Sequence, residues 1–153
     1  MRHNVLGVEI DAITEAKALD RITQFVHEGG PHQVVTANPE ILDNATRNLP
    51  LHYLIRRAAL VTADGQGVLL AGRILGTPFP ARVTGIDLAE ALCRESAERN
   101  LSLYFLGAEP GVVDEAAAKM RQAYPGVKIV GTHHGYFRNE GPAEVLADIM
   151  RTR

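Results

Sequence analysis

The chain has 153 residues, of which 46% are hydrophobic, and its formal net charge at pH 7 is −2. This length suits a single domain over residues 1–153, and the absence of a basic block argues against nucleic acid as the main partner. Cys93 is the only cysteine, which excludes an intrachain disulfide and fits a reducing compartment. The sequence also lacks the pattern of a signal peptide and the ~20 apolar residues of a membrane span, so we expect neither.

The first half of the chain alternates between strand-like and helix-like patterns. Thr14 can cap the first helix, whose apolar residues recur on one face, and Gly29-Gly30-Pro31 ends it. The strands expected in this half span 4–10, 33–36 and 59–62. The helices expected after the first one run from Asn38 to about Asn48, over 50–57 and over 68–75.

The second half continues the alternation. Thr84 can cap a helix in which Asp87 is the acid of a capping box. The apolar run 101–106 predicts a strand covered on both faces, and 127–131 predicts another. Further helices are expected up to Tyr124-Pro125-Gly126 and after Gly141-Pro142. The alternation predicts an α/β fold, with a mostly parallel, Rossmann-like sheet and helices on both faces.

Polar side chains follow two of the apolar runs, within the segments 34–40 and 63–67. Ligands bind at the carboxyl ends of strands in an open α/β sheet, so Thr36, Asn38 and Asp64 are candidate site residues. A carboxylate in such a place can accept a proton from an attacking hydroxyl, whereas Thr36 and Asn38 can bind a sugar or phosphate. The same residues also suit structural roles, Asp64 in a turn and Asn38 as a helix cap.

Other motifs are less specific. Arg82 precedes a predicted helix, and its planar guanidinium suits a diphosphate, although a solvated surface arginine is the alternative. Residues 107–111 lack the pattern of a P-loop or a dinucleotide fingerprint, so we expect an ordinary turn. His133 and His134 are adjacent and should point to opposite sides of an extended segment. We therefore predict no metal site and no cofactor.

Taken together, the motifs resemble those of the WecG/TagA/CpsF family of bacterial glycosyltransferases. Each motif is weak alone, but their order and separation through nearly the whole chain make the set specific. The matching segments are Thr36-Ala37-Asn38-Pro39-Glu40, Ala63-Asp64-Gly65-Gln66-Gly67, Arg82-Val83-Thr84-Gly85-Ile86-Asp87, Phe105-Leu106-Gly107 and Gly131-Thr132-His133-His134-Gly135-Tyr136-Phe137.

The resemblance implies an inverting, metal-independent enzyme. Such an enzyme moves an N-acetylhexosamine, best known as N-acetylmannosamine, from a UDP-sugar to a polyprenyl-diphosphate-linked sugar. The products are surface polymers such as teichoic acids. By this resemblance Asp64 is the base, and Thr36, Asn38 and Arg82 line the site. It also implies a cytoplasmic location at the inner face of the cell membrane, with peripheral membrane contact.

Family members usually continue past the point that matches Arg153. The resemblance therefore implies that later segments complete the donor pocket, and we expect this chain to fold alone but to bind UDP weakly. A non-catalytic nucleotide- or sugar-binding domain is the rival interpretation. The oligomeric state, including a homo-oligomer, stays open.

Overall fold

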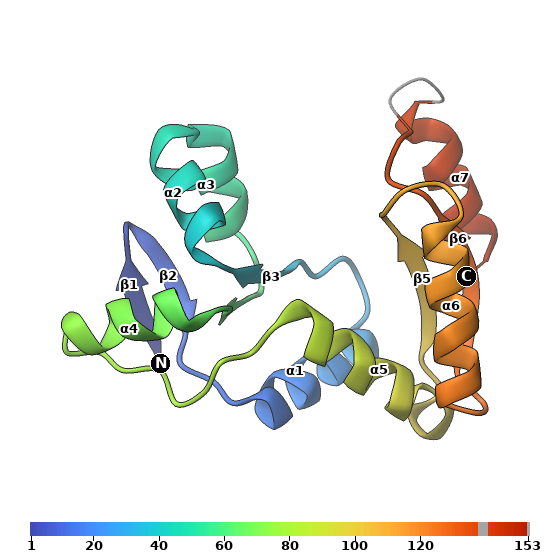
Figure 1. Cartoon of the computed structure of the whole chain (residues 1–153), viewed down its shortest axis with the longest axis horizontal. Coiled ribbons are helices and arrows are strands. Elements are labelled where there is room, and N and C mark those ends of the chain that lie inside the picture. The colour runs from blue at the N-terminus through green and yellow to red at the C-terminus, as the bar shows by residue number, and fades with distance from the viewer. Residues whose placement is uncertain (138–140, 153) are drawn as a thin grey trace. The chain divides into compact units, whose positions relative to one another are not determined.

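A computed structural model describes residues 1–137 and 141–152. The chain divides into two compact units, Met1–Ala89 and Glu90–Arg153, here called the N-terminal and C-terminal units. Most elements of both are labelled in Figure 1. The expectation of a single domain over residues 1–153 stays a prediction.

The N-terminal unit begins with an antiparallel hairpin of β1 (Arg2–Val5) and β2 (Val8–Asp11). The prediction of one strand over 4–10 is therefore wrong. Leu6 and Gly7 form the turn with φ angles of 52° and 84°, and the Gly7 amide donates to Asn4 Oδ1 at 3.0 Å. Because Leu-Gly lacks the Asn or Asp that usually marks a two-residue turn, the apolar pattern resembled an unbroken strand.

Helix α1 (Glu15–Glu28) follows the hairpin, and its predicted boundaries are confirmed. Thr14 Oγ1 accepts a hydrogen bond from the Lys17 amide at 3.5 Å. Gly29 ends the helix with a φ of 72°, a backbone conformation that glycine adopts without steric cost.

The centre of this unit is a parallel pair, β3 (Val34–Ala37) and β4 (Leu60–Ala63), in which Thr36 lies opposite Thr62. The Val61 amide donates to Asp11 Oδ2 at 2.9 Å, which ties the hairpin to β4. The helices that follow these strands are α2 (Pro39–Arg47), α3 (Leu49–Arg56) and α4 (Gln66–Ile74). Their order and approximate limits agree with the sequence-based prediction.

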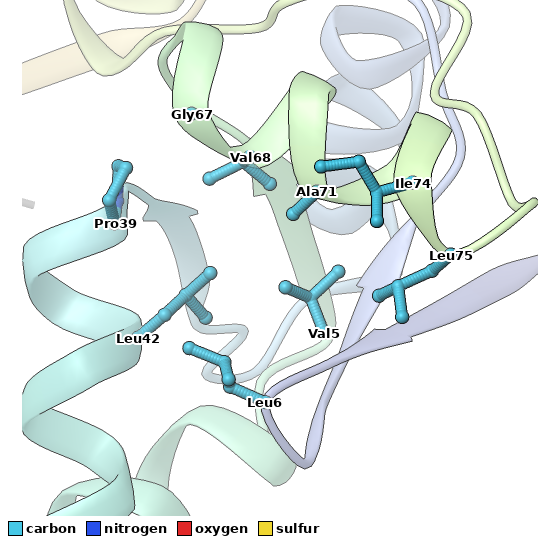
Figure 2. Close-up of a pocket in the computed structure, with 9 residues that line it drawn as sticks. All are labelled: Val5, Leu6, Pro39, Leu42, Gly67, Val68, Ala71, Ile74 and Leu75. Atoms are coloured by element: carbon cyan, nitrogen blue, oxygen red, sulfur yellow. The ribbon is translucent and has the colours of Figure 1, made fainter.

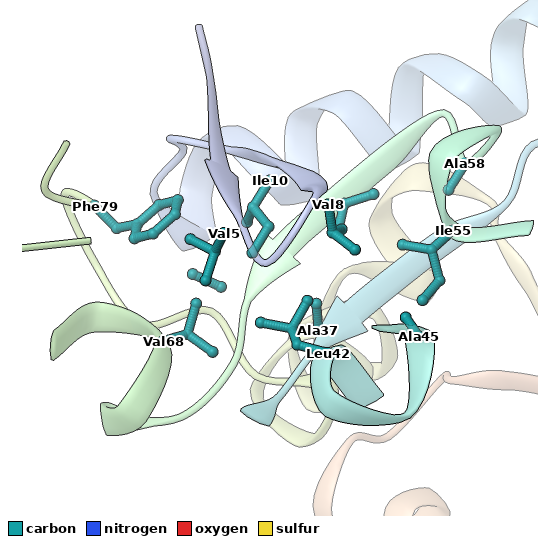
Figure 3. Close-up of a cluster of buried hydrophobic side chains, with 12 residues drawn as sticks. Val5, Val8, Ile10, Ala37, Leu42, Ala45, Ile55, Ala58, Val68 and Phe79 are labelled. Carbon is teal, nitrogen blue, oxygen red and sulfur yellow. The ribbon is translucent and has the colours of Figure 1, made fainter. Parts of the chain in front are cut away.

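Two apolar clusters cover the two faces of this pair. Val61 belongs to the larger cluster, which contains residues of the hairpin, α2, α3 and α4 (Figure 3). Leu60 belongs to the smaller cluster, with Phe25 of α1 and Leu88 of α5 (Gly85–Arg99). Neighbouring residues of a strand point to opposite faces, so the change of cluster between Leu60 and Val61 shows that both faces are packed.

The C-terminal unit contains a second parallel pair, β5 (Ser102–Leu106) and β6 (Lys128–His133). Helices α6 (Val112–Ala123) and α7 (Pro142–Arg151) complete it, together with most of α5. The prediction that β5 is covered on both faces is wrong, because its central residues are half-buried and its ends are exposed. The α/β class with parallel strand pairs is confirmed, although each sheet within the described residues has two strands.

Candidate active site

The predicted site residues converge at the carboxyl ends of β3 and β4. Thr36 is the penultimate residue of β3, and Asp64 directly follows β4. The Asp64 amide donates to the carbonyl oxygen of Ala37 at 2.9 Å, so the ends of the two strands are joined at this point. This is the edge at which ligands bind in open parallel sheets.

Asn38 has the structural role that its position allowed. Its Oδ1 accepts a hydrogen bond from the Ile41 amide at 2.8 Å and caps α2, with Pro39 at the first helical position. The cap uses only the Oδ1 atom of Asn38 as an acceptor. The Nδ2 group carries two further hydrogens that can donate to a ligand. A ligand-binding role for Asn38 therefore stays a prediction beside the confirmed cap.

The turns that carry Asn38 and Asp64 pack directly against each other through Pro39. A Cβ atom added to Gly67 would lie 2.8 Å from Pro39 Cγ, which is closer than real Cβ contacts come. Gly65 has a φ of 93° and also faces Pro39, whose Cδ would lie 3.5 Å from an added Cβ. These two glycines are thus required by backbone geometry and close packing, and they set the position of Asp64 beside the Asn38 turn.

Arg82 reaches the same strand end through the residue that follows it. The Val83 amide donates to the carbonyl oxygen of Ala63 at 2.9 Å. The hydroxyl of Thr62 donates to the carbonyl oxygen of Val83 at 3.0 Å, and both Thr62 and Val83 are fully buried. Arg82 itself is exposed. The backbone at Arg82 is therefore held beside Ala63, the residue that precedes Asp64. The Arg82 side chain stays available to a ligand.

The start of α5 brings a third motif to the site. Thr84 Oγ1 accepts a hydrogen bond from the Asp87 amide at 3.0 Å, so the predicted cap is confirmed. A Cβ atom added to Gly85 would lie 3.1 Å from Thr36 Oγ1. The first turn of α5 therefore lies against the Thr36 hydroxyl. The segments that carry Thr36, Asp64 and Gly85 thus meet at the carboxyl ends of β3 and β4.

The Asp64 side chain is half-buried. Within the described residues its carboxylate has no hydrogen bond or ion pair, which leaves the oxygens available to accept a proton. No group of three or more His, Cys, Asp or Glu in the described part of the chain could hold a metal ion. The residues gathered here suit binding of an oxygen-rich, anionic ligand and removal of a proton from it.

The carboxyl ends of β5 and β6 are joined by backbone hydrogen bonds, from Gly107 N to the His133 oxygen and from Gly135 N to the Ala108 oxygen, both 2.9 Å. The expectation that the side chains of His133 and His134 point apart is wrong. Their ring centroids lie 4.6 Å apart, because β6 ends at His133 and the chain turns there.

Sequence reasoning missed the polar contact between Tyr104 and Asp148 in the C-terminal unit. The Tyr104 hydroxyl on β5 donates to Asp148 Oδ2 on α7 at 2.5 Å, and Arg151 Nη2 donates to Asp148 Oδ1 at 2.8 Å. The hydrogen bond to Asp148 raises the pKa of Tyr104 to about 12, and the same bond lowers the pKa of Asp148. No short motif links residues 104 and 148, so only the fold could reveal this contact.

Parallel strand pairs that lead into helices make this an α/β protein, and its candidate ligand site lies at the carboxyl ends of β3 and β4 in the N-terminal unit. The sequence model of the glycosyl transferase WecG/TagA/CpsF family matches residues 3–153. The chain belongs to this family, and the resemblance found in its motifs is confirmed.

Two similar proteins come from Staphylococcus aureus, and both are named N-acetylglucosaminyldiphosphoundecaprenol N-acetyl-beta-D-mannosaminyltransferase. The protein of strain NCTC 8325 / PS 47 is 33% identical over 135 residues, which cover 87% of this chain and 53% of the relative. The protein of strain MRSA252 is 32% identical with the same coverage. The chain thus spans about half the length of the curated relatives it matches.

Proposed function

We propose that this chain contains the acceptor-activating part of an inverting glycosyltransferase that uses a UDP-sugar donor. The acceptor is a polyprenyl-diphosphate-linked sugar. The transferred group is an N-acetylhexosamine, and we propose N-acetylmannosamine. The names of the S. aureus relatives support both assignments. The observation that carries the proposal is the convergence of Thr36, Asp64 and the Arg82 backbone at one strand end in a chain of this family.

In the proposed reaction Asp64 is the general base. The acceptor hydroxyl forms a bond to the anomeric carbon of the donor sugar while the bond from that carbon to UDP breaks. UDP leaves with the electron pair, and the hydroxyl proton passes to the Asp64 carboxylate. The half-buried position of Asp64 and its lack of a partner within the described residues support this role.

Thr36, Asn38 and Arg82 bind substrate in this proposal. The exposed guanidinium of Arg82 is suited to a diphosphate because it can donate two parallel hydrogen bonds. The Thr36 hydroxyl and the Nδ2 group of Asn38 are suited to sugar hydroxyls or phosphate oxygens.

We propose that the protein acts at the inner face of the cell membrane, in the synthesis of a surface polymer such as teichoic acid, because the proposed acceptor is lipid-linked. Within the described residues, no helix has both the length and the apolar character to cross a bilayer. We propose peripheral membrane contact through the lipid-linked acceptor.

The rival function is a nucleotide- or sugar-binding domain without turnover, since the exposed Arg82 and the Thr36 hydroxyl would also suit binding alone. The test measures UDP release from UDP-N-acetylmannosamine with a lipid-diphosphate-linked N-acetylglucosamine acceptor, alongside calorimetric binding of both substrates. Turnover that requires Asp64 supports the enzyme. Binding of both substrates by the folded chain without any turnover supports the rival and overturns a catalytic role for Asp64 in this chain.

A further inference from the structure

The N-terminal unit contains an apolar groove between α2, α4 and the β1–β2 hairpin. Its volume is about 370 Å³, within the ~300–1,000 Å³ of typical small-molecule sites. None of the nine residues that line it carries a polar side chain. In Figure 2 the apolar side chains of α4, α2 and the hairpin surround a shared hollow. The groove therefore suits a hydrocarbon ligand that needs no hydrogen bonds.

The groove has a buried floor and an open rim. Val5, Leu42 and Val68 form the floor and are almost fully buried. Leu6, Ile74 and Leu75 line the rim, with exposed fractions of 59%, 76% and 56%. Large apolar side chains gathered around an open hollow are typical of a binding surface rather than of ordinary scattered surface residues.

Leu6 is also held in a backbone conformation that leucine rarely adopts. Its φ is 52°, whereas glycine and asparagine are the residues that usually occupy this region. The side chain remains mostly exposed, so its burial within the unit does little to offset the strain. Strain of this kind is concentrated at ligand sites, where another interaction can offset it.

The groove adjoins the turns that carry the proposed active site. Pro39 and Gly67 line the groove, and the same two residues form the close contact between the two site turns. Asn38 directly precedes Pro39, and Asp64 lies three residues before Gly67. A ligand with a polar head beside Asp64 could therefore place an attached apolar chain in the groove.

We propose that this groove binds the isoprenoid chain of the polyprenyl-diphosphate-linked acceptor. The inference rests on the proposed function, which supplies an acceptor with an apolar chain next to its diphosphate. The names of the S. aureus relatives include such a lipid, N-acetylglucosaminyldiphosphoundecaprenol. The isoprenoid units nearest the diphosphate contact the floor formed by Val5, Leu42 and Val68, while Leu6 and Ile74 cover them from the rim.

The test measures binding of geranyl, farnesyl and geranylgeranyl diphosphate to the 153-residue protein by calorimetry. Inorganic pyrophosphate is the control probe, because it has no hydrocarbon part. Affinity should rise with chain length, because each added isoprenoid unit removes more apolar surface from water. Leu6→Asn and Ile74→Gln should each weaken geranylgeranyl diphosphate binding by roughly five- to tenfold, and pyrophosphate binding should not change.

Two features make these variants specific. Leu6→Asn should keep or raise the melting temperature, because asparagine tolerates a positive φ, so weaker binding could not be attributed to unfolding. Leu54→Gln is the matched control, since Leu54 is 53% exposed on α3 and does not line the groove. It should leave the affinity for every probe unchanged.

Equal affinity across the chain-length series, or unchanged affinity in both rim variants, would overturn the proposal. So would a dimer of this chain that Ile74→Gln dissociates and that excludes the prenyl probes, because a second copy would then cover the groove. Turnover of the unaltered chain separates this inference from the catalytic one: groove-dependent prenyl binding without turnover would retain the lipid site and reject the catalytic role of Asp64.

Discussion

The parallel pairs β3–β4 and β5–β6 each lead into helices, but they differ in whether the polar side chains around them have partners. At the end of β4, Asp64 is half-buried without a partner within the described residues, beside packed turns that hold it in place. Backbone hydrogen bonds join the strand ends in the C-terminal unit as well, but there the polar side chain of Tyr104, in the middle of β5, has a partner, because its hydroxyl donates to Asp148 of α7. The comparison indicates that similar secondary structure can carry the proposed reactive site in one unit and an internally bonded polar pair in the other.

The largest expected effect concerns Asp64. Asp64→Asn should retain the fold and lower turnover by about 10²–10⁴-fold, because the amide cannot accept the proton. Steady-state kinetics with UDP-sugar and lipid acceptor, supported by circular dichroism, would measure this. Asp43→Asn is the matched control, since Asp43 is an exposed residue of α2 that pairs with Arg47. Near-normal turnover in folded Asp64→Asn would show that Asp64 is not the general base, and the proposed catalytic difference between the two units would then be wrong.

The next effect concerns ligand binding by Arg82. Arg82→Ala should weaken binding of diphosphate-containing substrates by about 10- to 100-fold, the range expected for lost hydrogen bonds to a charged group. The melting temperature should change little, because the side chain is exposed and the buried contacts belong to Val83. Arg73→Ala, at an exposed position on α4, is the control for a general loss of positive charge. Equal effects of the two variants would contradict a specific role.

A third prediction tests the packed turns. Gly67→Ala should destabilise the N-terminal unit by about 1–3 kcal/mol, because the added methyl group would overlap Pro39. Denaturant unfolding of this variant should be compared with that of Gln66→Ala. Gln66 is the exposed neighbour at the start of α4, where alanine should be tolerated. A fully stable Gly67→Ala would show that close contact with Pro39 does not fix this turn.

The smallest effect lies in the C-terminal unit. The raised pKa of Tyr104 means that its hydrogen bond with Asp148 stabilises the fold fully below the ordinary tyrosine pKa of 10. That contribution is lost as the pH rises through about 12. Because the pKa of Asp148 is lowered, its contribution is present above the ordinary value of 3.8 and is lost as the pH falls through the lower folded value.

Tyrosine ionisation measured by ultraviolet absorbance would test this contact. Tyr104→Phe should remove a titration step near pH 12, whereas Tyr53→Phe on α3 should leave it in place. Turnover near neutral pH should be unchanged in Tyr104→Phe, because this residue is outside the proposed site. A wild-type titration without that step would contradict the Tyr104–Asp148 contact.

The amino-acid sequence determined the features that depend on near neighbours. The caps at Thr14, Asn38 and Thr84 each use a backbone amide three residues later, so local sequence is enough to predict them. The strand–helix order and the positions of Thr36 and Asp64 near strand ends also follow from local periodicity and turn residues. The hairpin was missed because Leu6 occupies a turn position that glycine or asparagine usually marks.

Only the tertiary structure decided which of these residues meet. The contact of Pro39 with Gly67, the hydrogen bonds of Val83 at the end of β4 and the Tyr104–Asp148 pair join positions distant in sequence. The apolar groove likewise combines residues from the hairpin, α2 and α4. Such contacts depend on how helices and strands pack to bury their apolar faces, and the pattern within any single segment specifies only the face and not its partner.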